Sequence, residues 1–176
     1  TVRPNGAYGR PIWVRFDGSR ADTQDMTTTH RRLVSVAAIV SVALLGLTGC
    51  QETTTADQAQ VIKQVNQSRK QYGRKSLKVD QQLNVKADAW AQNLRNKCRL
   101  SHSNLRDGAP SDWRRLGENV GYASSISKVH AAYMKSSGHR ANILDGDFDR
   151  IGVGAVSGRC NGHNLVFTVQ VFLDQD

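Results

Sequence analysis

A basic and apolar segment near the N-terminus divides this chain into two parts of different character. His30-Arg31-Arg32 precedes an apolar run from Leu33 to Leu47, and no acidic residue occurs between Met26 and Gln51. A basic region followed by an apolar region and small residues is typical of an export signal. The run is shorter than the roughly 18 to 20 apolar residues of a membrane-spanning helix, so a permanent transmembrane anchor is the weaker alternative. The sequence therefore predicts an exported protein whose folded part follows this segment.

The tetrapeptide Leu47-Thr48-Gly49-Cys50 resembles the lipobox of bacterial lipoproteins. In that motif a signal peptidase cuts before a cysteine that carries acyl chains on its sulfur. The resemblance implies that residues 26–49 are a lipoprotein signal peptide and that Cys50 anchors the mature chain to the outer face of a membrane. The expected location is extracytoplasmic and lipid-anchored, and ordinary secretion is the alternative.

The export signal also sets the expected domain boundaries. Met26 is the first methionine, and signal peptides stand at the start of their precursors, so residues 1–25 are expected to be an upstream extension that is not native. The polar stretch 50–57 is expected to be a short tether. Residues 58–176 are then the folded domain.

The folded part is basic. The chain carries a net charge of +9, and residues 50–176 retain 18 Lys and Arg against 12 Asp and Glu. Anionic lipid headgroups, phosphate-rich wall polymers or acidic glycans are the natural counterparts of an exported basic domain, rather than nucleic acid. The cations are scattered along the sequence without interleaved aromatic residues, which favours a solvated surface. Hydrophobic residues make up 39% of the chain, close to the globular average, so a packed core is expected.

Three cysteines remain to be assigned. If Cys50 carries lipid, Cys98 and Cys160 form an even pair in an oxidising compartment. A bridge between them would close some 60 residues and contribute roughly 3 to 4 kcal/mol in the chain-entropy model. The sequence predicts this disulfide, and two separately buried free thiols are the alternative.

Local patterns predict helices first and strands last. Asp57 and Gln60 have the spacing of a capping box, and Gly73 is the expected end of the first helix. Asp80 is the expected cap of a second amphipathic helix, and a third helix is expected from Ser125. The predicted ranges are 57–73, 80–98 and 125–138 for helices, 101–113 for a polar loop, 116–122 for a strand entry, 150–156 and 164–173 for alternating strands, and 157–163 for their connection. This order predicts an α+β fold.

Six short motifs then occur in one order along the chain. They are the spaced set Leu77, Asp80, Leu83, Ala87, Trp90 and Ala91, followed by Ser101-His102-Ser103, Leu116-Gly117-Glu118-Asn119-Val120, Ser137-Gly138-His139-Arg140-Ala141-Asn142-Ile143-Leu144, Ile151-Gly152-Val153-Gly154 and Gln170-Val171-Phe172. In this combination the chain resembles the bacterial branch of the CAP superfamily, named after cysteine-rich secretory proteins, antigen 5 and pathogenesis-related proteins of group 1. The resemblance covers about residues 58–174. It implies a three-layer α–β–α sandwich with a central antiparallel sheet and a surface cleft.

The resemblance also implies a site. Members of the family line the cleft with two histidines and one or two acidic residues, and some bind zinc or another divalent cation there. Carried over by motif, these residues are His102, Glu118 and His139. The second glutamate of animal and plant members is missing, because its place reads Lys135-Ser136-Ser137. Two imidazoles and one carboxylate are a common catalytic zinc set. The alternative is that these three side chains bond to each other and to the loop backbone and hold no ligand.

Three classes of function remain open. The favoured one is a non-catalytic extracytoplasmic binding module whose cleft accepts a divalent metal, a lipid or a cell-wall fragment. The first alternative is a zinc-dependent hydrolase of peptide or wall material, in which His102 and His139 hold zinc and Glu118 acts as base or ligand. No Gly-x-Ser-x-Gly motif accompanies the serines near the histidines, so a serine nucleophile is not expected. The second alternative is a protein with a vestigial cleft that binds the envelope or a partner, for example a host protein.

Overall fold

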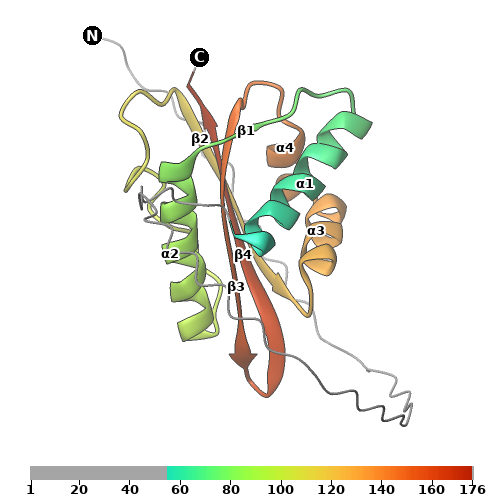
Figure 1. Cartoon of the computed structure of the whole chain (residues 1–176), viewed down its shortest axis with the longest axis vertical. Helices are drawn as coiled ribbons and strands as arrows, with labels where there is room; N and C mark the ends of the chain where they lie inside the picture. Colours follow the sequence, from blue (N-terminus) through green and yellow to red (C-terminus); the bar gives the residue numbers. More distant parts are fainter. Residues whose placement is uncertain (1–54, 176) are drawn as a thin grey trace, which may run out of the picture. The chain divides into compact units, whose positions relative to one another are not determined.

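The computed structural model of the chain describes residues 55–175 (Figure 1). The predicted extension, the predicted signal peptide and Cys50 lie outside these residues. Among the helices of residues 55–175, none combines the length and the apolar character that crossing a membrane requires. The described part contains one sheet, two clusters of buried hydrophobic side chains and a disulfide, as expected of a domain that folds independently.

Helices and strands follow one another in a mixed order. The elements are α1 (Ala56–Gln71), β1 (Lys78–Val79), α2 (Gln81–Lys97), β2 (Arg115–Ala123), α3 (Ile126–Lys135), α4 (Ser137–Leu144), β3 (Arg150–Cys160) and β4 (His163–Asp174). The strands form one sheet in the order β1-β3-β4-β2. β4 pairs antiparallel with both β3 and β2, which confirms the predicted antiparallel centre. The two-residue β1 adds a parallel pair with β3 that the sequence does not predict, because so short a strand has no alternation.

Helices cover both faces of the sheet, as the family resemblance implies (Figure 1). α2 lies on one face, and its side chains Leu83 and Leu94 form one core cluster with Phe167 of β4. α1, α3 and α4 lie on the other face, where a second cluster includes Val65 and Phe172. The three-layer α–β–α arrangement is therefore present in the described residues.

α2 approaches β3 more closely than ordinary side chains allow. A Cβ atom on Gly152 would lie 2.2 Å from the backbone carbon of Leu83, and one on Gly154 would lie 2.2 Å from the carbonyl oxygen of Ala87. Real Cβ atoms do not come within 3.0 Å of such atoms. These two glycines of the Ile-Gly-Val-Gly motif therefore set the distance between the helix and the sheet.

The first helix begins earlier than predicted. Thr55 and Gln58 form the capping box in place of Asp57 and Gln60: the Thr55 hydroxyl accepts from the Gln58 amide, and the Gln58 side chain accepts from the Thr55 amide. The Gln58 side chain is buried and donates to the carbonyl of Val153, 2.8 Å away, so a contact with β3 fixes the helix start. Ala56 and the following residue belong to α1 and not to the predicted tether. The predicted cap of α2 is confirmed, because Asp80 accepts from the Leu83 amide.

The predicted third helix is two helices. α3 ends at Lys135, Ser136 is extended, and α4 begins at Ser137, so Gly138 lies in the first turn of α4 and does not end α3. The predicted connection at residues 157–163 is also mostly strand. Only Asn161 and Gly162 form the turn, with φ angles of 50° and 82°. An Asn-Gly pair with positive φ at both residues is favoured in two-residue hairpin turns, because their twist matches that of the strands.

Arg69 joins α1 to the segment that follows α4. Its side chain is completely buried. The guanidinium donates to the backbone carbonyls of Lys75, Ile143, Asp145 and Phe148 at distances between 2.7 and 3.3 Å. The carbonyl of Ile143 belongs to the last turn of α4, so Arg69 satisfies an acceptor that the helix itself leaves open.

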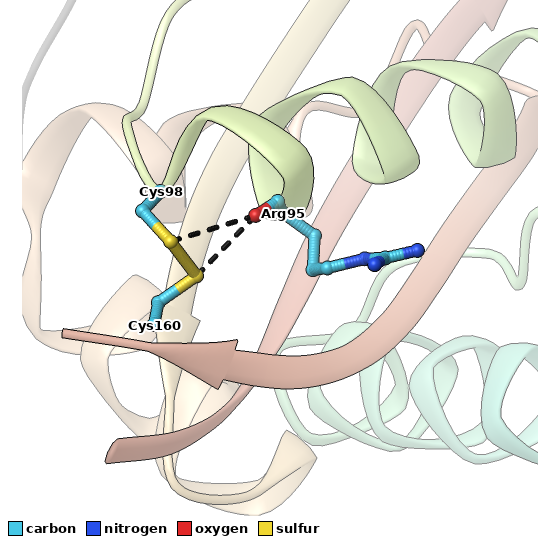
Figure 2. Close-up of a disulfide and its surroundings, with 3 residues drawn as sticks. All are labelled: Arg95, Cys98 and Cys160. Atoms are coloured by element: carbon cyan, nitrogen blue, oxygen red, sulfur yellow. Dashed lines mark hydrogen bonds between the residues drawn. A yellow bond between two sulfur atoms is a disulfide. The ribbon is translucent and has the colours of Figure 1, made fainter. Parts of the chain in front are cut away.

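The predicted disulfide between Cys98 and Cys160 is confirmed, with a Cα–Cα distance of 5.5 Å (Figure 2). Cys98 follows α2 in the left-handed conformation, and Cys160 is the last residue of β3. Both sulfur atoms lie near the carbonyl oxygen of Arg95, at 3.6 and 3.3 Å. A disulfide sulfur carries no proton to donate, so these are close contacts only. The bridge fastens the C-terminal end of α2 to the β3–β4 hairpin.

Candidate functional site

The loop between α2 and β2 positions the first predicted histidine. Trp90 of α2 donates its indole N–H to the carbonyl of Ser101, 2.8 Å away. Lys86, one turn earlier, donates to the carbonyls of Asn104 and Asp107. Burial lowers the pKa of Lys86. His102 lies between these two attachments, so α2 holds the loop on both sides of it.

Glu118 of β2 is the centre of this part of the site. Its Oε1 lies 2.7 Å from Nδ1 of His102 and 2.9 Å from the backbone nitrogen of Ser103, and its Oε2 lies 2.6 Å from Oγ of Ser103. The carboxylate side chain is 1% exposed and that of His102 is 29% exposed. A carboxylate only accepts hydrogen bonds, so His102 carries its proton on Nδ1 in this arrangement. Glu118 thereby fixes the orientation and the tautomer of the imidazole.

His139 enters from the other helical layer. It lies in the first turn of α4 and is buried, with its Nδ1 2.9 Å from Oγ of Ser136 and its ring centre 4.8 Å from that of Tyr133. Burial lowers the pKa of His139 to about 4, and the charge of nearby His102 adds to this shift. His139 is therefore a neutral imidazole at neutral pH. The break between α3 and α4, which the sequence did not predict, provides both Ser136 and the helical turn that carries this histidine.

A buried amide network that the sequence analysis did not single out as part of the site joins β2 to α4. Asn119 is fully buried, and its Nδ2 donates to the carbonyl of His139 and to Oε1 of Gln170. Asn142 donates to Oδ1 of Asn119 at 2.9 Å and to the carbonyl of Glu118 at 3.3 Å. The sequence did contain a signal for this network, the polar pair Glu118-Asn119 in a predicted strand. Polar residues that a strand buries need hydrogen-bond partners, so the pair indicated such partners nearby.

The structure brings the three predicted site residues to one edge of the sheet, since β2 is an edge strand. Glu118 and Asn119 are consecutive in β2, so their side chains point to opposite faces. Glu118 meets His102 on the α2 side, while Asn119 meets the backbone of His139 on the α4 side. The two histidines thus approach the edge strand from different layers.

The arrangement does not fit a three-ligand metal site. Within residues 55–175, no group of three or more His, Cys, Asp or Glu side chains is placed to hold a metal ion. The Glu118 carboxylate is 1% exposed and already accepts three hydrogen bonds from His102 and Ser103, which leaves it poorly placed to ligate a metal ion without rearrangement. Metal binding by His102, Glu118 and His139 stays a prediction.

The geometry also bears on nucleophilic chemistry. An activated serine donates its hydroxyl proton to a histidine nitrogen. Here the hydroxyl of Ser103 donates to Glu118, whereas Oγ of Ser136 lies 2.9 Å from Nδ1 of the buried His139. Cys98, the thiol nearest to His102 in sequence, is in the disulfide. The site therefore holds a His102 imidazole oriented by the Glu118 carboxylate and a buried, neutral His139 imidazole beside Ser136.

The described residues thus form a disulfide-bonded α–β–α domain in which Glu118 of the edge strand holds His102 of the preceding loop. The sequence matches the cysteine-rich secretory protein family, CAP, over residues 62–172. The chain belongs to this family, which confirms the resemblance drawn from the motifs.

A bacterial relative and several solved structures are similar to this chain. The uncharacterized protein YkwD of Bacillus subtilis is 31% identical over 118 residues, which is 62% of this chain and 46% of that protein. This chain therefore spans less than half of that relative's length. Among solved structures, an outer surface protein of Borrelia burgdorferi has a TM-score of 0.59 at 18% identity, over 70% of this chain and 96% of that one. An extracellular SCP-domain protein of Bacillus anthracis has a TM-score of 0.56 at 23% identity, over 66% and 40%. These likenesses to solved structures establish the fold.

Proposed function

We propose that this protein is an exported, lipid-anchored CAP domain that acts as a non-catalytic binding module of the cell envelope. We assign the ligand site, and the cleft that the family resemblance implies, to the edge of the sheet around His102, Glu118 and His139. The proposed export agrees with the names of two proteins of the same fold, one an outer surface protein and the other extracellular. The lipid anchor rests on Cys50 and the lipobox-like residues before it.

The observation that carries the proposal is the burial and hydrogen bonding of Glu118. A catalytic carboxylate must exchange a proton with substrate or water, and it needs an oxygen that can reach them. Glu118 is buried, and its two oxygens accept three hydrogen bonds from residues of the adjacent loop. Its present contacts suit a carboxylate that shapes the cleft for binding. The family's second acidic residue is also missing from residues 135–137.

A hydrolase is the second candidate, and one observation favours it. A carboxylate that holds Nδ1 of a histidine is the usual support for an imidazole acting as a metal ligand or as a general base. His102 has this support from Glu118. The hydrogen bonds of Glu118 also suit the vestigial-cleft alternative, and ligand titrations separate that alternative from the binding module.

Two titrations of residues 50–176 carrying Cys50→Ser test the binding module. Zinc is titrated by calorimetry into this protein and into its His102→Ala, His139→Ala and His163→Ala variants. His163 is exposed on the β3–β4 hairpin, away from the cleft, and is the matched control. Purified muropeptides are titrated in the same way. Binding of either compound that His102→Ala and His139→Ala abolish and His163→Ala preserves would support the proposal.

Turnover is measured on the same muropeptides by mass spectrometry. The proposal expects intact muropeptides after prolonged incubation, with and without zinc. Cleavage that disappears in His102→Ala would overturn the non-catalytic function in favour of the hydrolase. Labelling of the full chain with an alkyne fatty acid tests the anchor separately, and the expected label is lost in Cys50→Ser.

A further inference from the structure

The charged side chains are distributed unevenly between the two ends of the sheet. All ion pairs found within residues 55–175 lie at the end where β2 and β3 begin and β4 ends. They join Arg114 to Asp174, Arg115 to Asp145 and Asp147, Arg150 to Asp80 and Asp149, and His102 to Glu118. The cations at this end are therefore largely neutralised by neighbouring carboxylates.

The opposite end, at the β3–β4 hairpin, carries cations without such partners. We call the set Arg95, Lys97, Arg99, Lys128 and Arg159 the hairpin-end surface. Lys97, Arg99, Lys128 and Arg159 are exposed, and none of the five takes part in an ion pair of the described residues. Two acidic side chains belong to the same elements: Asp57 of α1, which lines the groove at this end, and Asp88 of α2, seven residues before Arg95, which accepts a hydrogen bond from Gln92.

Two contacts show that these cations come together although they belong to different elements. The disulfide joins the end of α2, with Lys97 and Arg99 beside Cys98, to the hairpin residue Cys160 (Figure 2). The aliphatic part of Arg95 lies over Gly158, where a Cβ atom would be 2.6 Å from its Cδ. The end of α2 is therefore packed directly on the hairpin.

A groove on the other side of the hairpin brings in α1 and α3. It has a volume of about 480 Å³ and is lined by Asp57 of α1, Ser125 before α3, and Arg159 and Asn164 of the hairpin, among others. Lys128 lies in the first turn of α3, whose cap is Ser125. The groove thus places Asp57, at the start of α1, beside the hairpin, while the next residue, Gln58, is bonded to Val153 farther along β3.

The start of the domain is also where a lipid anchor would attach. Thr55, which caps α1, follows Cys50 by five residues. A chain of this length spans at most about 18 Å. An anchor at Cys50 would therefore keep the hairpin end close to the headgroups. Glu118 is paired with Val171 of β4, seven residues beyond Asn164, so the cleft lies roughly 23 Å farther along the strands.

We propose that the hairpin-end surface docks on the anionic headgroups of the membrane and directs the cleft away from it. Clustered Lys and Arg near a membrane each strengthen attachment to anionic lipid, by about fivefold for each side chain. The orientation rests on the proposed lipid anchor, whereas the affinity of the surface for anionic lipid does not. The docking is electrostatic, so it weakens as salt screens the charges.

Vesicle sedimentation tests the docking without the anchor. Residues 50–176 carrying Cys50→Ser are mixed with phosphatidylcholine vesicles and with vesicles that contain about 30% phosphatidylglycerol. The triple variant Lys97→Glu, Arg99→Glu, Arg159→Glu is compared with the control triple Lys70→Glu, Lys75→Glu, Lys78→Glu. The control changes three exposed lysines by the same charge at the other end of the domain. Circular dichroism checks that both variants fold.

The expected result is salt-sensitive binding to the anionic vesicles alone. The hairpin-end triple should weaken it by about tenfold or more, and the control triple should weaken it far less. Equal losses in both triples would overturn the proposal, because net charge alone would then explain binding. Absence of binding to anionic vesicles would overturn it too, as would equally tight binding to soluble polyphosphate, which would indicate a general polyanion surface. Fatty-acid labelling of Cys50 is independent of these results, so failure of the anchor and failure of docking are distinguishable.

Discussion

Ser103 gives Glu118 two hydrogen bonds, one from its backbone nitrogen to Oε1 at 2.9 Å and one from its hydroxyl to Oε2 at 2.6 Å. With the bond from His102, the carboxylate holds two successive loop residues on the edge strand. Trp90 and Lys86 hold the loop on either side of these two residues, so the conformation of His102 and Ser103 between them depends on one buried carboxylate.

Replacing Glu118 by Gln should therefore destabilise the domain and release the histidine. An amide keeps one acceptor oxygen but presents an N–H to the hydroxyl or to the imidazole, so about 1 to 3 kcal/mol of unfolding free energy should be lost. Urea denaturation measures this loss, and nitrogen chemical shifts of the imidazole report the tautomer. Ser103→Ala is the control, because it removes one bond and should cost about 1 kcal/mol while His102 keeps its proton on Nδ1. An unchanged tautomer in Glu118→Gln would contradict this role.

His139 should make the domain less stable in mild acid. Its pKa is lowered to about 4 by burial, whereas an unfolded histidine titrates near 6.5. Between these pH values His139 binds a proton in the unfolded chain but not in the folded domain. The contribution of His139 to the unfolding free energy therefore falls as the pH drops from about 6.5 to 4, and it changes no further below that. The loss is on the order of 3 kcal/mol. Denaturation of wild type and His139→Gln across this range measures it.

The titration has a necessary control. Burial also lowers the pKa of His130, which lies between α1 and α3 with its Nε2 2.8 Å from Oγ of Ser68. This histidine contributes a loss of the same sign. His130→Gln should therefore leave most of the acid sensitivity in place, and His139→Gln should remove the larger share. The reverse ranking would contradict the assignment to the cleft.

The disulfide should contribute about 4 kcal/mol. It links residues 62 positions apart, and the chain-entropy model gives this value for a loop of that length. Urea denaturation of the double variant Cys98→Ser, Cys160→Ser against wild type measures the loss. Alkylation and mass spectrometry of exported protein should find neither thiol free before reduction, and two alkylated residues would contradict the bridge.

Gly154→Ala should be among the most damaging single substitutions. The added methyl would meet the backbone of Ala87 at 2.2 Å, and neither α2 nor β3 can move without disturbing the core on that face. Overpacking of this kind costs roughly 1 to 3 kcal/mol, and backbone contacts place it at the upper end. Gly146→Ala is the control, because a methyl there meets only the end of the Arg74 side chain at 3.3 Å. Similar denaturation midpoints for the two variants would refute this account.

The elements that the sequence predicted best are those with local signals. Asp80 could be recognised as a cap, and the alternation in β3 and β4 identified two strands, because both signals lie within a few residues. The start of α1 was misplaced because Gln58 is fixed by Val153, 95 residues away. The division of the third helix at Ser136 was missed because nothing in the local sequence forbids helix there.

The site was predicted only in part for a similar reason. The motifs identified His102, Glu118 and His139, but the opposite directions of Glu118 and Asn119 appear only once β2 is an edge strand between two layers. The hairpin-end surface had no signal in the sequence, because its cations are separated by up to 64 positions and meet through the disulfide and the turn.

The hydrogen bonds of Arg69, which join α1 to the end of α4, should be insensitive to pH. Its four hydrogen-bond acceptors are all main-chain carbonyls, and neither a guanidinium nor a carbonyl changes protonation in the physiological range. The join between α1 and the end of α4 should therefore persist in acid that weakens the packing around His130 and His139. Acidification would then loosen the packing around His139 while the Arg69 hydrogen bonds keep α1 and the end of α4 together. Neutralisation would restore that packing without refolding of the whole domain.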